Sequence, residues 1–177
     1  MAKNINKFDP TRPRAIAGLK FQKEVLDKLS HMPNVKHVED VRSWLKRLNE
    51  NYTEYELNIG ERFNGDITFV AGDKRYFVEC CLAMGEVSRM SEHKRRMFKG
   101  KNKWYCWGRL DKPATICFVP SLMWAKYCKK LGLVAREGTV FRLVPRRILG
   151  KNLKAAKMSC CEFIDEIRKE RGKNDTI

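Results

Sequence analysis

Two carboxylates in the segment 64–82 provide the clearest chemical signal in this sequence. The segment reads as two strands joined by a turn at Gly72 and Asp73, with Asp66 on the first strand and Glu79 on the second. If that turn is a two-residue loop, counting outward from it places Asp66 directly opposite Glu79. Opposed residues share one face of a hairpin, with Cβ atoms roughly 4.5–5.5 Å apart. Like charges repel at that distance unless a cation lies between them, so the pattern predicts a divalent metal site.

The same two residues also have a plainer interpretation. The apolar runs 67–70 and 76–78 are typical of buried strands, in which a carboxylate is costly unless it is paired. Asp66 fits a turn residue that follows Asn64 and Gly65. Glu79 fits an edge-strand residue that faces water or bonds an arginine. From the residues alone, both interpretations remain open.

The charge balance narrows the class of partner. The chain has 37 Lys and Arg residues against 21 Asp and Glu, which gives a formal net charge of +16 in 177 residues and a pI near 9.7. This excess favours a polyanion, and nucleic acid is the leading expectation. No apolar run approaches the roughly 18 residues that span a bilayer, and no secretory signal follows the first residues. We therefore expect an intracellular protein with no membrane segment.

The seven cysteines do not form a recognisable framework. Their number is odd, two pairs are adjacent in sequence (Cys80 with Cys81, and Cys160 with Cys161), and no Cys-x-x-Cys occurs. The three histidines show no ligand spacing either. We expect reduced thiols that act as small apolar side chains, without a structural zinc site.

The elements that position the two carboxylates form one predicted domain over residues 15–172. A basic arm over 1–14 precedes it and either lies along a phosphate backbone or is a disordered terminus. A flexible tail over 173–177 follows it. Apolar residues at helical spacing predict helices over 15–32 and 38–48, and alternation over 55–59 predicts a strand before the hairpin. Downstream we expect a helix capped by Ser88 or Ser91 that contains 93–98, and strands over 103–109 and 114–119. A helix that begins after 120–121 and runs through 131 follows, then a strand over 139–144 and a last helix that ends at Gly172.

At this point the order of motifs resembles a known family. Gly65-Asp66-Ile67 and Phe77-Val78-Glu79-Cys80 resemble the two core motifs of the PD-(D/E)XK nuclease superfamily, which includes restriction endonucleases and Holliday-junction resolvases. The segment 18–24 resembles its helix motif, which offers a Glu or Gln near the metal. The resemblance covers roughly residues 18–119. It implies an α/β (α+β) fold of the restriction-endonuclease type, with a central mixed β-sheet flanked by helices.

One position departs from the family pattern. The family motif ends Glu-x-Lys, whereas Cys81 stands two residues after Glu79. Some members with this layout, including viral cap-snatching endonucleases, supply the lysine from the following helix. By that resemblance Lys94 is the first candidate, with Lys74 and Lys99 as weaker substitutes. A solvated lysine among basic neighbours is the alternative.

The resemblance also implies a chemistry and a set of ligands. Asp66 and Glu79, with the carbonyl of Cys80 and either Gln22 or Glu24, would hold Mg²⁺ or Mn²⁺, which activates water to attack a phosphodiester. Three functions follow: an endonuclease acting on DNA, including structured or branched DNA, with a homodimer expected because two strands are cut; a catalytically inactive nucleic-acid-binding module; or a Mn²⁺-dependent RNA endonuclease.

Further basic residues are candidates for phosphate contacts. They are Arg12, Arg14, Arg95, Arg96, Lys99, Lys101 and Lys103. Basic and aromatic residues also alternate over 101–107, where Trp104, Tyr105 and Trp107 either stack on unpaired bases or fill a core.

Overall fold

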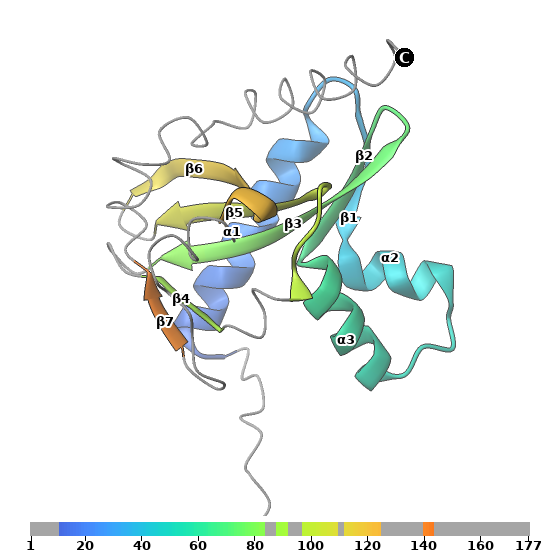
Figure 1. Cartoon of the computed structure of the whole chain (residues 1–177), viewed down its shortest axis with the longest axis horizontal. Coiled ribbons are helices and arrows are strands. Elements are labelled where there is room, and N and C mark those ends of the chain that lie inside the picture. Colours follow the sequence, from blue (N-terminus) through green and yellow to red (C-terminus); the bar gives the residue numbers. More distant parts are fainter. Residues whose placement is uncertain (1–10, 84–87, 92–96, 110–111, 125–139, 144–177) are drawn as a thin grey trace, which may run out of the picture.

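The computed structural model describes residues 11–83, 88–91, 97–109, 112–124 and 140–143 (Figure 1). Three helices lie in this part of the chain: α1 (Pro13–Ser30), α2 (Val41–Leu48) and α3 (Glu54–Asn64). The strands are β1 (Val35–Asp40), β2 (Ile67–Ala71), β3 (Lys74–Ala83), β4 (Ser88–Ser91), β5 (Lys103–Arg109), β6 (Lys112–Pro120) and β7 (Val140–Leu143).

Five strands form one mixed sheet in the order β1-β2-β3-β5-β6. The β3–β5 pair is parallel, and the other three pairs are antiparallel. β4 and β7 form a separate antiparallel pair. The expected α+β class, with a central mixed sheet flanked by helices, is therefore confirmed.

The β2–β3 hairpin has the register that the two-residue loop predicts. Ala71 pairs with Lys74, and the ladder continues to the pair of Ile67 with Val78. Gly72 in the loop has φ 65°, a backbone conformation that favours glycine. The paired residues end at Ile67 with Val78, and beyond them the N–H of Asp66 donates to the carbonyl of Val78. The predicted two-residue loop is therefore confirmed, whereas the direct pairing of Asp66 with Glu79 stays a prediction.

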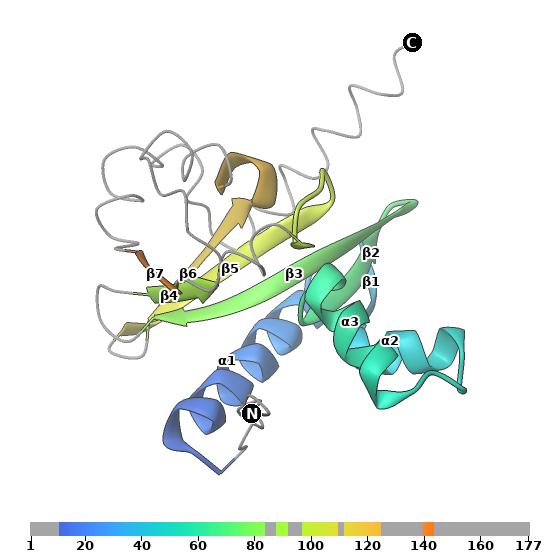
Figure 2. The ribbon, with the colours of Figure 1, turned by 60° about the horizontal axis from the view of Figure 1, so that its bottom comes forward.

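Helices cover both faces of the sheet. On one face α1 packs Phe21, Val25 and Leu29 against a cluster that includes Val78 and Trp104. On the other face α2 and α3 contribute Val41, Leu45 and Leu57 to a second cluster with Phe77, Tyr105 and Trp107. Figure 2 shows α1 crossing beneath β3, with α2 and α3 grouped near β1 and β2. Side chains of β3 therefore enter apolar clusters on both sides.

The predicted strand over 55–59 is wrong, because this segment belongs to α3. Thr53 caps that helix: its side chain accepts from the N–H of Glu56, while the Glu56 carboxylate accepts from the N–H of Thr53. Of the alternating residues Tyr55, Leu57 and Ile59, only Leu57 is buried, and Tyr55 is exposed. The apolar residues alternate along the sequence although they lie on different sides of one helix, with Leu57 facing inward and Tyr55 facing outward.

Three other boundaries differ from expectation. Residues 35–40 form β1, and α2 begins only at Val41, where Asp40 caps it by accepting from the N–H of Ser43. α1 begins at Pro13, since proline suits the first helical position. Residues 88–91 form β4 rather than a helix cap. The helix expected over 93–98 falls almost wholly outside the described residues, as do the last predicted helix and the tail over 173–177.

The remaining strands lie where the sequence predicts them. β5 has the expected bounds 103–109, β6 contains 114–119, and β7 lies within 139–144. Cys80, Cys81 and Cys106 are free thiols, as expected for these three. Among the helices described here, none is both long and apolar enough to cross a membrane.

Candidate functional site

Asp66 lies at the entry to β2 and completes the end of the hairpin. Its N–H donates to the carbonyl of Val78 at 2.8 Å, and its Oδ2 accepts from the N–H of Cys80 at 2.7 Å. Gly65 before it has φ 79° and lies against the Val78 carbonyl. The carboxylate is half-buried and is held by backbone on the neighbouring strand. Asp66 therefore has a structural role whether or not it binds a metal.

Glu79 lies in the middle of the sheet. Its side chain is only 1% exposed, and its residue pairs with Tyr105 of the parallel strand β5. Alternation along β3 places it on the face of Phe77 and Cys81, which pack in the apolar cluster under α2 and α3. Burying a carboxylate among such residues is unfavourable unless polar or charged groups compensate. Its position is thus costly for a residue that only fills space.

Cys80 directly follows Glu79 in the chain but points to the α1 face. A hydrogen bond with Cys106 raises the pKa of the Cys80 thiol, burial raises that pKa further, and Asp66 and Glu79 both add to the shift. The thiol is therefore kept neutral, and both carboxylates lie near enough to act on it. The carbonyl expected to bind a metal belongs to the same residue, inside the β3–β5 ladder.

The helix motif over 18–24 offers two candidate ligands, Gln22 and Glu24, and Gln22 contacts Asp66. The side-chain amide of Gln22 donates to the carbonyl of Asp66 at 3.3 Å. Glu24 lies roughly 200° further around an ideal helix, and its carboxylate is 3.4 Å from the ammonium of Lys28 on α1. The structure therefore brings Gln22, and not Glu24, to the hairpin.

Two of the three lysine candidates, Lys74 and Lys99, belong to the part of the chain that the structure describes. Lys74 lies at the loop end of the hairpin, paired with Ala71 and five residues from Glu79. Lys99 is exposed, and Lys94 lies outside the described residues. Cys81 is partly buried against the cluster that contains Trp107, so this position carries a small apolar side chain in a site where a lysine would be desolvated.

Lys103 provides a half-buried cation on the same face of the sheet. It pairs with Phe77 in the parallel β3–β5 ladder, two residues from the pair of Glu79 with Tyr105. Its ammonium donates to the carbonyl of Phe63 at 2.6 Å and lies 5.7 Å from the ring centroid of Phe98. Burial lowers the pKa of this ammonium. The sequence indicated Lys103 only as a phosphate contact.

Glu61 is a further carboxylate near Asp66 that the sequence did not indicate. Burial raises the pKa of Glu61; its ion pair with Arg42, at 3.0 Å, opposes that shift, and Asp66 and Asp40 add to it. Glu61 lies one helical turn after the buried Leu57, so the correct assignment of α3 would have placed it on the inward side. The cap formed by Thr53 was the available signal.

The basic and aromatic residues separate clearly by exposure. Arg12, Arg14, Lys99 and Lys101 are exposed, whereas Arg95 and Arg96 are not among the described residues. Trp104, Tyr105 and Trp107 are 1%, 0% and 3% exposed, so the base-stacking interpretation of these rings is wrong. They fill both clusters because helices cover both faces of the sheet.

Neither a cluster of metal ligands among the described residues nor a match to a known protein indicates the function. Over the described ranges, no group of three or more His, Cys, Asp or Glu residues could hold a metal ion. No family model matches the chain, and neither the curated proteins nor the solved structures contain a match. The assignment of a function therefore depends on the geometry of Asp66, Glu79 and their neighbours.

Proposed function

We propose that this protein is a metal-dependent endonuclease of the restriction-endonuclease-like fold that hydrolyses phosphodiester bonds in DNA. The observation that carries the proposal is the β2–β3 hairpin, whose ladder runs from Ala71 with Lys74 to Ile67 with Val78 and ends directly before Asp66 and Glu79. The excess of basic residues supports a nucleic-acid substrate. Because a duplex has two strands to cut, the proposal includes a homodimer.

The residues present suit a hard cation. Mg²⁺ is commonly held by one or two carboxylates together with water and substrate phosphates, so a third acidic side chain is not required. Asp66, Glu79 and the carbonyl of Cys80 would hold Mg²⁺ or Mn²⁺. When bound, such an ion polarises the phosphate and lowers the pKa of a water molecule. Gln22 fixes the backbone of Asp66 through its hydrogen bond, and burial of Glu79 keeps solvent from its carboxylate.

Lys103 completes the proposed site in place of the lysine that Cys81 replaces. Its ammonium is fixed by the Phe63 carbonyl and lies on the face of Glu79. A cation in a partly desolvated position stabilises negative charge on a phosphoryl group more strongly than one in bulk water. Lys103 would therefore supply the positive charge without leaving β5.

A second candidate function is a nucleic-acid-binding module without catalysis. Two observations favour it: the residue at the lysine position is Cys81, and Oδ2 of Asp66 already accepts a hydrogen bond from the hairpin backbone. Such a protein would keep the fold and the charge but would not hydrolyse its ligand.

A cleavage and binding panel separates the two candidates. Labelled duplex DNA, branched DNA and single-stranded RNA are incubated with the full chain and Mg²⁺, Mn²⁺ or EDTA. We expect DNA cleavage with either metal and none with EDTA. Binding that weakens with salt, without cleavage under either metal, would instead support the inactive module. Cleavage of RNA alone with Mn²⁺ would replace DNA by RNA as the substrate.

Replacing Lys103 with Met is expected to reduce cleavage about a hundredfold, the size of effect typical for loss of one fixed donor to a developing charge. Lys103→Arg is expected to recover part of that rate, because arginine restores the charge. Single-turnover rates at saturating DNA provide the measurement. Equal losses in both variants would indicate that Lys103 is only a structural lysine that satisfies the Phe63 carbonyl.

The wild type and Lys103→Met are also expected to differ in how their free energy of unfolding depends on pH. Because the pKa of Lys103 is lowered in the folded state, the unfolded chain binds more protons between that pKa and the ordinary value of 10.5. The free energy of unfolding of the wild type should therefore rise with pH across this window, relative to Lys103→Met. Urea titrations at several alkaline pH values test the sign of this difference.

A further inference from the structure

Exposed aromatic side chains lie on α3, where the sequence did not indicate a binding surface. Phe63 is 45% exposed and Tyr55 is 74% exposed. The two residues are separated by two helical turns, with half-buried Ile59 between them. Phe63 is in the last turn of α3, three residues before Asp66. It is therefore an uncovered ring next to the candidate site.

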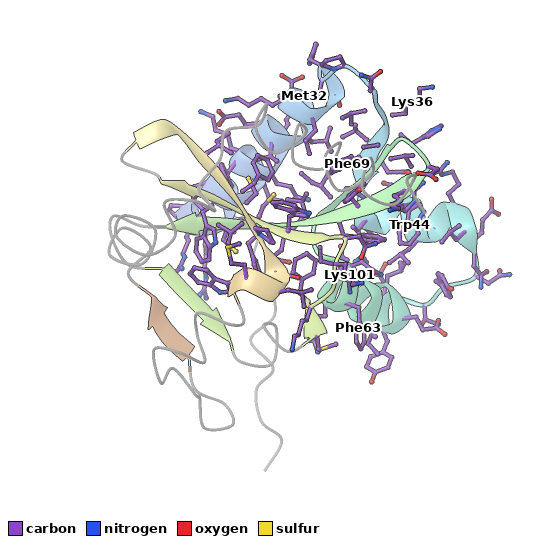
Figure 3. All side chains as sticks on the ribbon, turned by 45° about the horizontal axis from the view of Figure 1, so that its top comes forward. Met32, Lys36, Trp44, Phe63, Phe69 and Lys101 are labelled. Atoms are coloured by element: carbon purple, nitrogen blue, oxygen red, sulfur yellow. The ribbon has the colours of Figure 1, made fainter. Side chains whose placement is uncertain are left out.

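The basic side chain of Lys103 contacts the end of α3 that carries Phe63, and further lysines belong to the turn that precedes Lys103. The Lys103 ammonium is 2.6 Å from the Phe63 carbonyl. The backbone N–H of Lys103 donates to the carbonyl of Gly100, and this hydrogen bond closes the turn before β5. That turn carries exposed Lys101, and exposed Lys99 precedes it. Figure 3 labels Phe63 and Lys101 in the region where α3 ends and β5 begins. We name Arg62, Phe63, Lys99 and Lys101 the Phe63 patch.

The opposite end of the same helix has a different charge. Tyr55 lies between Glu54 and Glu56, whose carboxylates contact Arg42 and Thr53. Phosphate would be repelled there and attracted at the Phe63 patch, where the described residues 97–103 include three lysines and no acidic residue. The charge distribution therefore favours one of the two rings.

We propose that the Phe63 patch binds an unpaired nucleotide of the DNA, with its base stacked on Phe63 and its flanking phosphates held by Lys101, Lys99 and Arg62. In an intact duplex the faces of the bases are occupied by their neighbours, so only unpaired bases can stack on a side chain. The inference depends on the proposed function, since it specifies which form of DNA reaches the site. Phe63 thereby takes the stacking role that the sequence suggested for Trp104, Tyr105 and Trp107, whose rings are buried.

Equilibrium binding in EDTA tests the inference independently of catalysis. Fluorescence anisotropy compares a blunt duplex with the same duplex carrying a single-stranded overhang, using the full chain. We expect the wild type to prefer the overhang substrate. Phe63→Ala should weaken binding of that substrate roughly tenfold or more, as for loss of one stacked base, and should leave the blunt duplex within about twofold. Phe63→Trp should retain the preference.

Matched variants separate this inference from the proposed function. Tyr55→Ala removes the other exposed ring of α3 and should leave both affinities unchanged, whereas Lys101→Glu should weaken both substrates. Equal affinity of the wild type for the two substrates, or equal losses in Phe63→Ala and Tyr55→Ala, would overturn the stacking site while the endonuclease proposal stands. Absence of binding to either substrate would overturn both.

Discussion

Asp66→Asn and Glu79→Gln are each expected to reduce metal-dependent cleavage at least about a thousandfold while DNA binding is retained. Each change removes one negative charge but keeps the size of the side chain. A bound metal ion supplies several kcal/mol of transition-state stabilisation, and every 1.36 kcal/mol corresponds to a factor of ten in rate. Single-turnover cleavage with Mg²⁺ or Mn²⁺, together with anisotropy in EDTA, measures the two effects separately.

The choice of Asn at position 66 protects the hairpin. An Asn oxygen can still accept from the Cys80 N–H, so the contact that closes the end of β2 is preserved. Asp73→Asn, in the exposed loop of the same hairpin, removes an equal charge far from Glu79 and provides the control. Cleavage by Asp66→Asn at the rate of Asp73→Asn would exclude Asp66 as a metal ligand and favour the inactive module.

Gly65→Ala is expected to destabilise the protein by at least about 2 kcal/mol. Gly65 has φ 79° and ψ −155°, a region of backbone conformation that is essentially restricted to glycine. A Cβ atom there would lie 2.7 Å from the Val78 carbonyl oxygen and 2.8 Å from Cε2 of Phe98. Backbone strain and overlap would act together at the entry to β2. Urea denaturation followed by circular dichroism measures the loss.

Gly18 provides a matched control for this substitution. A Cβ atom at Gly18, on α1, would meet nothing within 4 Å. Gly18→Ala should therefore stabilise the protein by roughly 0.5–1 kcal/mol, because alanine is the better helix former. If the two alanine variants unfold at similar urea concentrations, the tight packing of Gly65 against Val78 and Phe98 is incorrect.

The local parts of this fold were predictable, and the long-range parts were not. A two-residue turn between β-branched runs determines the pairing of its flanking residues, so the register of the hairpin follows from counting. The segment around Leu57 was misassigned because a short run with apolar residues at alternate positions fits a strand as well as one side of a helix. The cap at Thr53 was a better guide than the alternation.

The candidate site was predictable only where it lies on one continuous segment. Asp66 and Glu79 belong to the hairpin, so their proximity is local. Lys103 is 24 residues beyond Glu79 in the sequence, and it reaches the same face only because β5 runs parallel to β3. A parallel neighbour requires a crossover, and the sequence does not indicate which strand returns beside β3. The positions of Glu61 and Phe63 likewise depend on the packing of α3.

The central place of β3 in the sheet affects how easily Glu79 can move relative to the lysines that precede β5. β3 is bonded to β2 on one side and to β5 on the other, so it cannot separate without opening two ladders at once. Glu79 directly follows the last β2–β3 pair and is itself held in the β3–β5 ladder, so local opening at Glu79 is costly. The exposed lysines belong instead to a turn at one end of β5, which needs far less energy to adjust. A polyanion that binds these lysines would therefore contact a part of the protein that can adjust to it, while the buried Glu79 stays fixed.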